Sequence, residues 1–272
     1  MTNGNQKKLW HGNEAVKFAS QVIEELEGIN QLQVAEWIEY DNVPLLEKCA
    51  KPHKKTLLHD YIDFIYYAHY DYLLDKHFPM IVINSLIELL EFYQVDYTAI
   101  GKFEHRGCED DDLESDEHDE AEEYARELFR FFLEKIGDLI IDDIFTILFA
   151  NKIFLFEFNR QLMELVHELS KAEHFEYLKK DGVIKRCLYI PQWLKRGVFM
   201  RDKGRCQICG TDLTKLLHLD NKENYDHIIP LENGGTNDPV NFQLTCESCN
   251  KSKGDRSMTF NSLATRFWEV ES

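Results

Sequence analysis

The stretch from Cys206 to Lys253 decides the fold. It contains Cys206-Gln-Ile-Cys209, Tyr225-Asp-His-Ile-Ile-Pro-Leu231, Asn233-Gly-Gly-Thr-Asn-Asp238, Val240-Asn-Phe-Gln-Leu244 and Cys246-Glu-Ser-Cys249-Asn-Lys-Ser-Lys253. Two Cys-x-x-Cys pairs are typical of a structural zinc site, because each pair spans one edge of a thiolate tetrahedron. Four thiolates leave no open coordination position, so this zinc is expected to hold the fold and to do no chemistry. The residues between the pairs, 210–245, exceed the usual zinc-ribbon spacer and are expected to contain a folded excursion.

The excursion is predicted to hold the chemistry. Its pattern indicates a strand, a turn at Gly234-Gly235 that permits positive φ, a second strand, and a short helix opened by the second cysteine pair. Asp226 and Asn250 flank this hairpin and helix, and their oxygens suit one Mg²⁺ or Mn²⁺ ion with open water positions. A neutral His227 imidazole beside such an ion accepts a proton from water near neutral pH.

Charge is distributed unevenly along the chain. The 272 residues include 31 Lys+Arg and 49 Asp+Glu, a net charge of −18. Residues 179–256 carry 14 basic and 10 acidic residues, whereas the remainder carries a net charge of −22. The short helix is expected to present Lys251, Lys253 and Arg256 to phosphate oxygens. The basic segment suits nucleic acid, while the net charge of −18 argues against a protein that coats nucleic acid or binds an anionic membrane.

At these motifs the chain resembles the HNH family of His-Me finger endonucleases in its zinc-ribbon form. The resemblance covers about residues 186–258 and begins with a lead-in helix near residues 190–202. The residues that carry it stand in the order of the family, namely the two cysteine pairs, Asp226-His-Ile-Ile-Pro-Leu231, Gly234-Gly235, Asn241 and Cys249-Asn-Lys-Ser-Lys253. The third motif position is Asn250 in place of His, which is a common variant of the family and keeps an oxygen ligand. His218 lies outside the motif and is expected to be structural or exposed.

The resemblance implies a ββα-metal fold and the hydrolysis of DNA phosphodiester bonds to 5′-phosphate and 3′-hydroxyl ends. His227 would act as the general base, and Asp226 and Asn250 would hold the catalytic Mg²⁺ or Mn²⁺. Asn241 would orient the loop that bears His227. Small HNH nucleases with a helical region also resemble effectors of restriction or phage defence, which work beside an ATPase or a sensor.

Residues 1–178 are predicted to form an all-helical acidic domain, which makes the chain mainly α. Apolar residues recur at helical spacing in the ranges 13–27, 31–40, 54–76, 80–97, 122–136 and 140–172. An acidic loop is expected over about 104–120, because 11 of the 15 residues from Glu109 to Glu123 are acidic and repel one another. The predicted HNH domain spans 184–258 and is followed by a tail, 259–272.

Composition also bears on location and partners. The first ten residues lack the apolar segment of a secretory signal, and no stretch is long and apolar enough for a membrane-spanning helix. Seven cysteines, an odd number, argue against a disulfide framework, so a cytoplasmic location is predicted. The acidic helical region, rich in aromatic residues, predicts a protein partner or a homo-oligomer.

Two other functions stay open at this point. An RNA-cleaving toxin that cuts tRNA would use the same active-site chemistry, because that chemistry acts on either backbone. A non-catalytic zinc ribbon that binds nucleic acid or protein would keep the cysteines and use His227 only as a structural residue.

Overall fold

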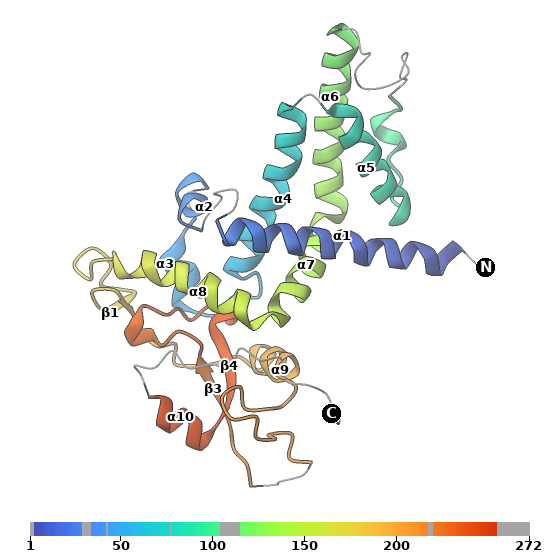
Figure 1. Cartoon of the computed structure of the whole chain (residues 1–272). Coiled ribbons are helices and arrows are strands. Elements are labelled where there is room, and N and C mark those ends of the chain that lie inside the picture. Colours follow the sequence, from blue (N-terminus) through green and yellow to red (C-terminus); the bar gives the residue numbers. More distant parts are fainter. Residues whose placement is uncertain are drawn as a thin grey trace. The chain divides into compact units, whose positions relative to one another are not determined.

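The structure is a computed structural model that describes residues 3–28, 34–41, 43–76, 78–103, 115–216 and 220–254. By compactness the chain divides into one unit of residues 1–22 and 62–147 and a second unit of residues 23–61 and 148–272. The architecture is mainly α, as predicted, and it contains two small antiparallel sheets (Figure 1). No helix within the described ranges is both long enough and apolar enough to span a bilayer.

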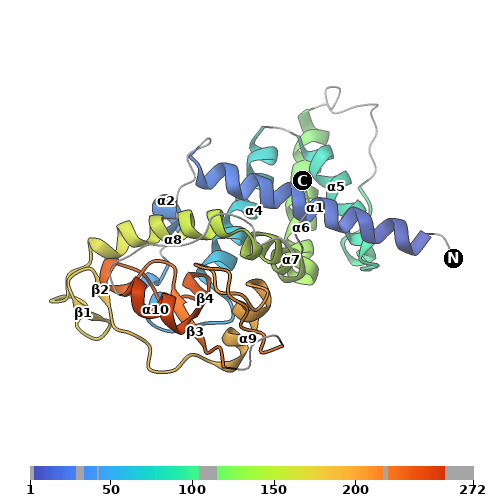
Figure 2. The same ribbon diagram turned by 60° about the horizontal axis from the view of Figure 1, so that its bottom comes forward.

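The first unit is a helical bundle with an aromatic core. Its elements are most of α1 (Asn3–Leu26), most of α4 (Leu57–Asp75), α5 (Pro79–Phe92), the 3-10 turn η1 (Thr98–Ile100), α6 (Ser115–Phe132), the π-helical turn η3 (Leu133–Gly137) and most of α7 (Asp138–Ala150). Helices α5 and α6 lie side by side in Figures 1 and 2. The ring centroids of Phe18 and Tyr66 are 4.4 Å apart, and those of Tyr70 and Phe129 are 4.8 Å apart. Burial of these rings removes a large apolar area from water and so stabilises the unit.

The second unit contains the predicted hairpin and short helix. Its elements are α2 (Val34–Tyr40), α3 (Leu45–Ala50), α8 (Lys152–His167), β1 (Leu178–Lys180), β2 (Val183–Ile184), α9 (Gln192–Arg201), β3 (Glu223–His227), the 3-10 turns η4 (Leu231–Asn233) and η5 (Pro239–Asn241), β4 (Phe242–Cys246) and α10 (Glu247–Lys253). Strands β3 and β4 are antiparallel, with Asp226 opposite Gln243 and His227 opposite Phe242. The order β3, β4, α10 along the chain is the ββα order that the sequence predicts.

Helix α9 covers one face of the hairpin. Leu194 and Val198 lie four residues apart on α9 and share one buried cluster with Phe242 and Leu244 of β4. Alternation along a strand places Phe242 and Leu244 on the same face. Gln243, between them, therefore points to the opposite face.

Segments that precede the predicted HNH domain complete this unit. The Leu57 N–H at the start of α4 donates to Asp238 Oδ2 at 2.9 Å. The Asn159 amide on α8 donates to the Val240 carbonyl at 3.2 Å. The compact unit therefore extends beyond the predicted HNH bounds of 184–258. The predicted domain boundaries at 178 and 184 stay a prediction, and the tail 259–272 lies outside the described residues.

Several predicted element bounds need correction. The acidic loop of 104–120 ends earlier, because α6 begins at Ser115. Residues 104–114 lie outside the described residues. The predicted helix of 140–172 is two helices, since the Asn151 side chain accepts the Phe154 N–H and caps α8. Helix α3 and the β1–β2 hairpin are too short to show a periodic pattern and were not predicted.

Candidate functional site

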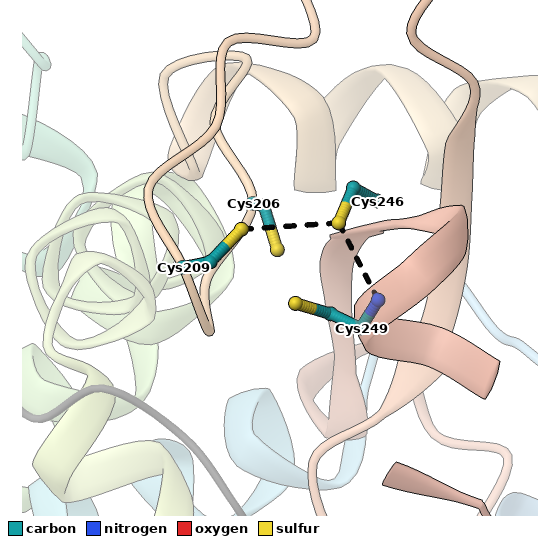
Figure 3. Close-up of side chains that lie close together, drawn as sticks. All are labelled: Cys206, Cys209, Cys246 and Cys249. Atoms are coloured by element: carbon teal, nitrogen blue, oxygen red, sulfur yellow. Dashed lines mark hydrogen bonds between the residues drawn. The ribbon is translucent and has the colours of Figure 1, made fainter. Parts of the chain in front are cut away.

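The four paired cysteines converge at one end of the hairpin. Their Sγ atoms all lie within 4.8 Å of one another (Figure 3). The Sγ atoms of Cys209 and Cys246 are 3.8 Å apart. A tetrahedral zinc ion with Zn–S bonds of about 2.3 Å requires sulfur atoms about 3.8 Å apart. The donor set and its spacing therefore fit structural zinc, as the sequence predicts.

Local backbone geometry brings these thiols together. The Cys206 N–H donates to the Thr211 carbonyl, and the Gly210 N–H donates to the Cys206 carbonyl, each at 2.9 Å, which closes a tight turn around the first pair. Gly210 has a φ of 77°, a conformation that favours glycine. The second pair opens α10, where the Cys249 N–H donates to Cys246 Sγ at 3.4 Å.

The environment of Cys246 favours the thiolate. Burial raises its pKa, but hydrogen bonds with the Ser248 hydroxyl, the Cys249 N–H and the thiols of Cys249 and Cys209 together lower the pKa to about 6. Because zinc binds thiolate and not thiol, this lowering favours metal binding at neutral pH.

His227 lies at the end of β3 and is buried. The residue is 2 % exposed, and the centroid of its ring lies 4.5 Å from the ring centroid of Phe242 on β4. Its Nε2 lies 3.3 Å from Oδ1 of Asn237. Burial, helped by the nearby charge of Arg186, lowers the pKa of His227 to about 3. The imidazole is therefore neutral at pH 7, the form that accepts a proton.

Asn241 ties the segment after His227 to the start of β4. Its Oδ1 accepts the Ile229 N–H at 2.8 Å, and its Nδ2 donates to the carbonyls of Ile229 at 3.0 Å and Thr236 at 2.9 Å. The backbone passes so close here that a Cβ at Gly235 would lie 1.9 Å from the Ile229 carbonyl oxygen. These bonds match the positioning that the sequence analysis expects of Asn241, whose role stays a prediction.

Asp226 faces a lysine. The Nζ of Lys253 lies 2.6 Å from Asp226 Oδ2, and the lysine side chain is 1 % exposed. The same ammonium donates to the carbonyl oxygen of His227. Gln243, opposite Asp226 on β4, approaches Asp226 Oδ2 at 3.4 Å. The structure thus brings together Asp226, Gln243 and Lys253 on one face of the hairpin, whereas His227 lies with Phe242 on the other.

Asp226, one of the predicted ligands of the catalytic ion, is paired with a lysine in this structure. The Lys253 ammonium already neutralises the Asp226 carboxylate, and a second cation beside it would be repelled. Asn250 lies half-buried on α10, three residues before Lys253. Among the described residues, one group of three or more side chains is arranged to hold a metal ion, and it consists of the four cysteines.

The predicted phosphate-binding residues have different environments. Lys251 is exposed and pairs with Glu247 at 2.6 Å, whereas Lys253 is buried against Asp226. Their predicted contacts with phosphate stay a prediction. Arg256 and His218 lie outside the described residues.

Two buried residues beside His227 were not assigned a role from the sequence. Asn237 contacts His227, and Asp238 accepts the N–H groups of Leu57 at 2.9 Å and Val240 at 3.0 Å. Burial raises the pKa of Asp238 to about 6, although these two N–H donors oppose the rise. The sequence signal for both was their position directly after the glycine turn.

Comparison with known proteins agrees with this reading of the hairpin. Residues 206–256 match the model of the HNH endonuclease family. No curated protein matches the chain. No solved structure matches it either. The C-terminal part therefore contains a small HNH domain with a cysteine cluster, and the N-terminal helices carry no family match.

Proposed function

With the HNH match over residues 206–256 as the premise, we propose that this chain is a metal-dependent endonuclease that hydrolyses phosphodiester bonds in DNA. The match carries the proposal, and the four clustered cysteines support it because their spacing fits the structural zinc site expected of the zinc-ribbon type. The biological role proposed is that of a cytoplasmic restriction or phage-defence effector.

Each site residue has a proposed role. His227 takes the proton of the attacking water, and Asn241 holds the adjacent loop in place. Lys251 offers an exposed ammonium to a phosphate oxygen. Bound Mg²⁺ or Mn²⁺ would stabilise charge on the leaving oxygen. Asp226 and Asn250 remain the proposed ligands, and the Asp226–Lys253 pair must open before they are free to bind an ion.

A plasmid-nicking assay tests this function. The zinc-loaded full chain is incubated with supercoiled plasmid and, in parallel, with total RNA, in Mg²⁺, in Mn²⁺ and in EDTA. We expect nicking of the plasmid that needs a divalent ion and is lost in His227→Ala. Because His227 is buried, its replacement could unfold the domain. The zinc content and circular dichroism of the variant are therefore measured to show that the fold is kept. His174→Ala, a half-buried histidine outside residues 206–256, is the matched control and should nick normally.

The outcomes separate the candidates. Cleavage of RNA without cleavage of the plasmid would overturn the proposed DNA endonuclease and favour the RNA-cleaving toxin. Equal nicking by wild type and His227→Ala would overturn the assignment of the base. DNA retardation without cleavage in any metal would favour a non-catalytic binding module, the second candidate. The burial of His227 and the Asp226–Lys253 pair are the observations that favour this second candidate.

The acidic helical region is proposed to bind a partner protein, such as an ATPase or sensor, or a second copy of this chain. The residues outside 179–256 carry a net charge of −22 and would repel DNA, so delivery by a partner offsets that repulsion. Size-exclusion chromatography with light scattering tests the homo-oligomer. A monomer that nicks DNA at its full rate without any added protein would contradict both forms of this proposal.

A further inference from the structure

Asn237 makes four side-chain contacts that determine its orientation. Its Nδ2 donates to the carbonyls of Ala50 at 3.0 Å and Lys185 at 2.8 Å. Its Oδ1 accepts the Cys187 N–H at 3.2 Å. The fourth contact joins Oδ1 to Nε2 of His227 at 3.3 Å. A flipped amide would place its NH₂ group against the Cys187 N–H and its oxygen against two carbonyl oxygens, so the flipped orientation is excluded.

The orientation of Asn237 determines where the His227 proton lies. An amide oxygen only accepts hydrogen bonds, so Nε2 of His227 must be the nitrogen that donates. The neutral imidazole, which is the form that acts as a general base, carries one N–H. The other nitrogen, Nδ1, therefore keeps its lone pair.

We infer that Asn237 is a positioning residue for the general base: it holds the His227 imidazole in the Nε2–H tautomer, so that Nδ1 is the atom that accepts the proton of the attacking water. This inference rests on the proposed function. Asn237 itself does not touch the reacting atoms. Its role is to set which ring nitrogen is basic and to prevent the ring from rotating away.

Asn237 also couples the base to distant parts of the chain. Its backbone N–H donates to the Cys49 carbonyl at 2.9 Å, next to the contact of its side chain with Ala50. Asn237 is 0 % exposed, so these bonds are shielded from competition by water. Segments around residues 49–50 and 185–187 thereby hold the amide, and the amide holds the imidazole.

Nitrogen NMR of the zinc-loaded full chain reads the tautomer directly. The chain is labelled with ¹⁵N in histidine, and the His227 resonances are assigned by their loss in His227→Gln. We expect a protonated Nε2 and an unprotonated Nδ1 in the wild type. Asn237→Ala should show exchange between the two tautomers. Asn159→Ala is the matched control, because Asn159 is also buried and donates to two carbonyls but does not touch His227.

Cleavage kinetics give a second, independent measurement. Asn237→Ala should lower kcat for plasmid nicking about 10- to 100-fold with little change in KM, while Asn159→Ala should change kcat far less. The inference would be overturned if the wild type is active but its His227 carries the proton on Nδ1 or exchanges between tautomers. Asn237→Ala with an unchanged tautomer and an unchanged kcat would overturn it as well. A wild type that cleaves neither DNA nor RNA would instead overturn the proposed function, and with it the catalytic meaning of the tautomer.

Discussion

Replacement of Asn241 by alanine gives the sharpest test of how the loop beside His227 is held. Asn241 is 0 % exposed and satisfies the Ile229 N–H and the carbonyls of Ile229 and Thr236. Asn241→Ala leaves these three buried backbone groups without their partners. Each unsatisfied group costs about 1–3 kcal/mol, and partial access of water reduces the total, so we expect a loss of about 3–5 kcal/mol in the free energy of unfolding.

Hydrogen exchange measured by mass spectrometry localises this loss. We expect exchange in a peptide that covers residues 225–231 to accelerate by at least about 100-fold, because about 1.4 kcal/mol corresponds to each factor of ten. Asn224→Ala is the control on the same hairpin, since its half-buried amide makes one long contact of 3.4 Å to the Lys222 carbonyl. It should change exchange in this peptide by about twofold or less. If Asn241→Ala exchanges no faster than Asn224→Ala while it retains zinc, the assigned role of Asn241 is wrong.

Three further outcomes are expected. Cys249→Ser should abolish stoichiometric zinc binding in a colorimetric release assay, whereas Cys187→Ser, outside the cluster, should retain one zinc ion per chain. Because burial raises the pKa of Asp238 from 3.8 to about 6, the folded state disfavours its charged form. Its contribution to stability should therefore fall by about 3 kcal/mol as the pH rises from about 4 to about 7, and urea titrations of wild type and Asp238→Asn should diverge by that amount. Lys253→Met should tighten Mn²⁺ binding about tenfold in an electron paramagnetic resonance titration, relative to Lys251→Met, because the carboxylate loses its buried counterion. Equal affinities in the two lysine variants would show that this ammonium does not compete with the ion.

Local patterns were sufficient to predict much of this protein. The two Cys-x-x-Cys pairs predicted the cysteine cluster, because the short turn within each pair brings its two thiols close enough to bind the same zinc ion, almost independently of the surrounding fold. Helical periodicity predicted most of the helices, since burial of one face every 3.6 residues leaves a regular signal. The strand–turn–strand–helix pattern predicted β3, β4 and α10 in the observed order.

The partners of the buried polar residues depended on the tertiary structure. Asn237 reaches the Ala50 carbonyl across 187 residues, and Asp238 caps Leu57 across 181 residues. Such pairs have no period and no fixed spacing, so a single sequence carries no signal for them. The burial of Lys253 against Asp226 has the same origin, because the side chain points inward only once α10 has packed on β3.

The sequence by itself therefore determined the hairpin with its cysteine cluster and the kind of chemistry its residues suit. Only the tertiary structure decided which nitrogen of His227 has a hydrogen-bond acceptor, which cation lies beside Asp226, and which N-terminal residues complete the unit. The physical reason is range. A thiolate pair or an amphipathic helix is specified by neighbours within a few residues, whereas a buried hydrogen bond is specified by whichever distant segment supplies its second half.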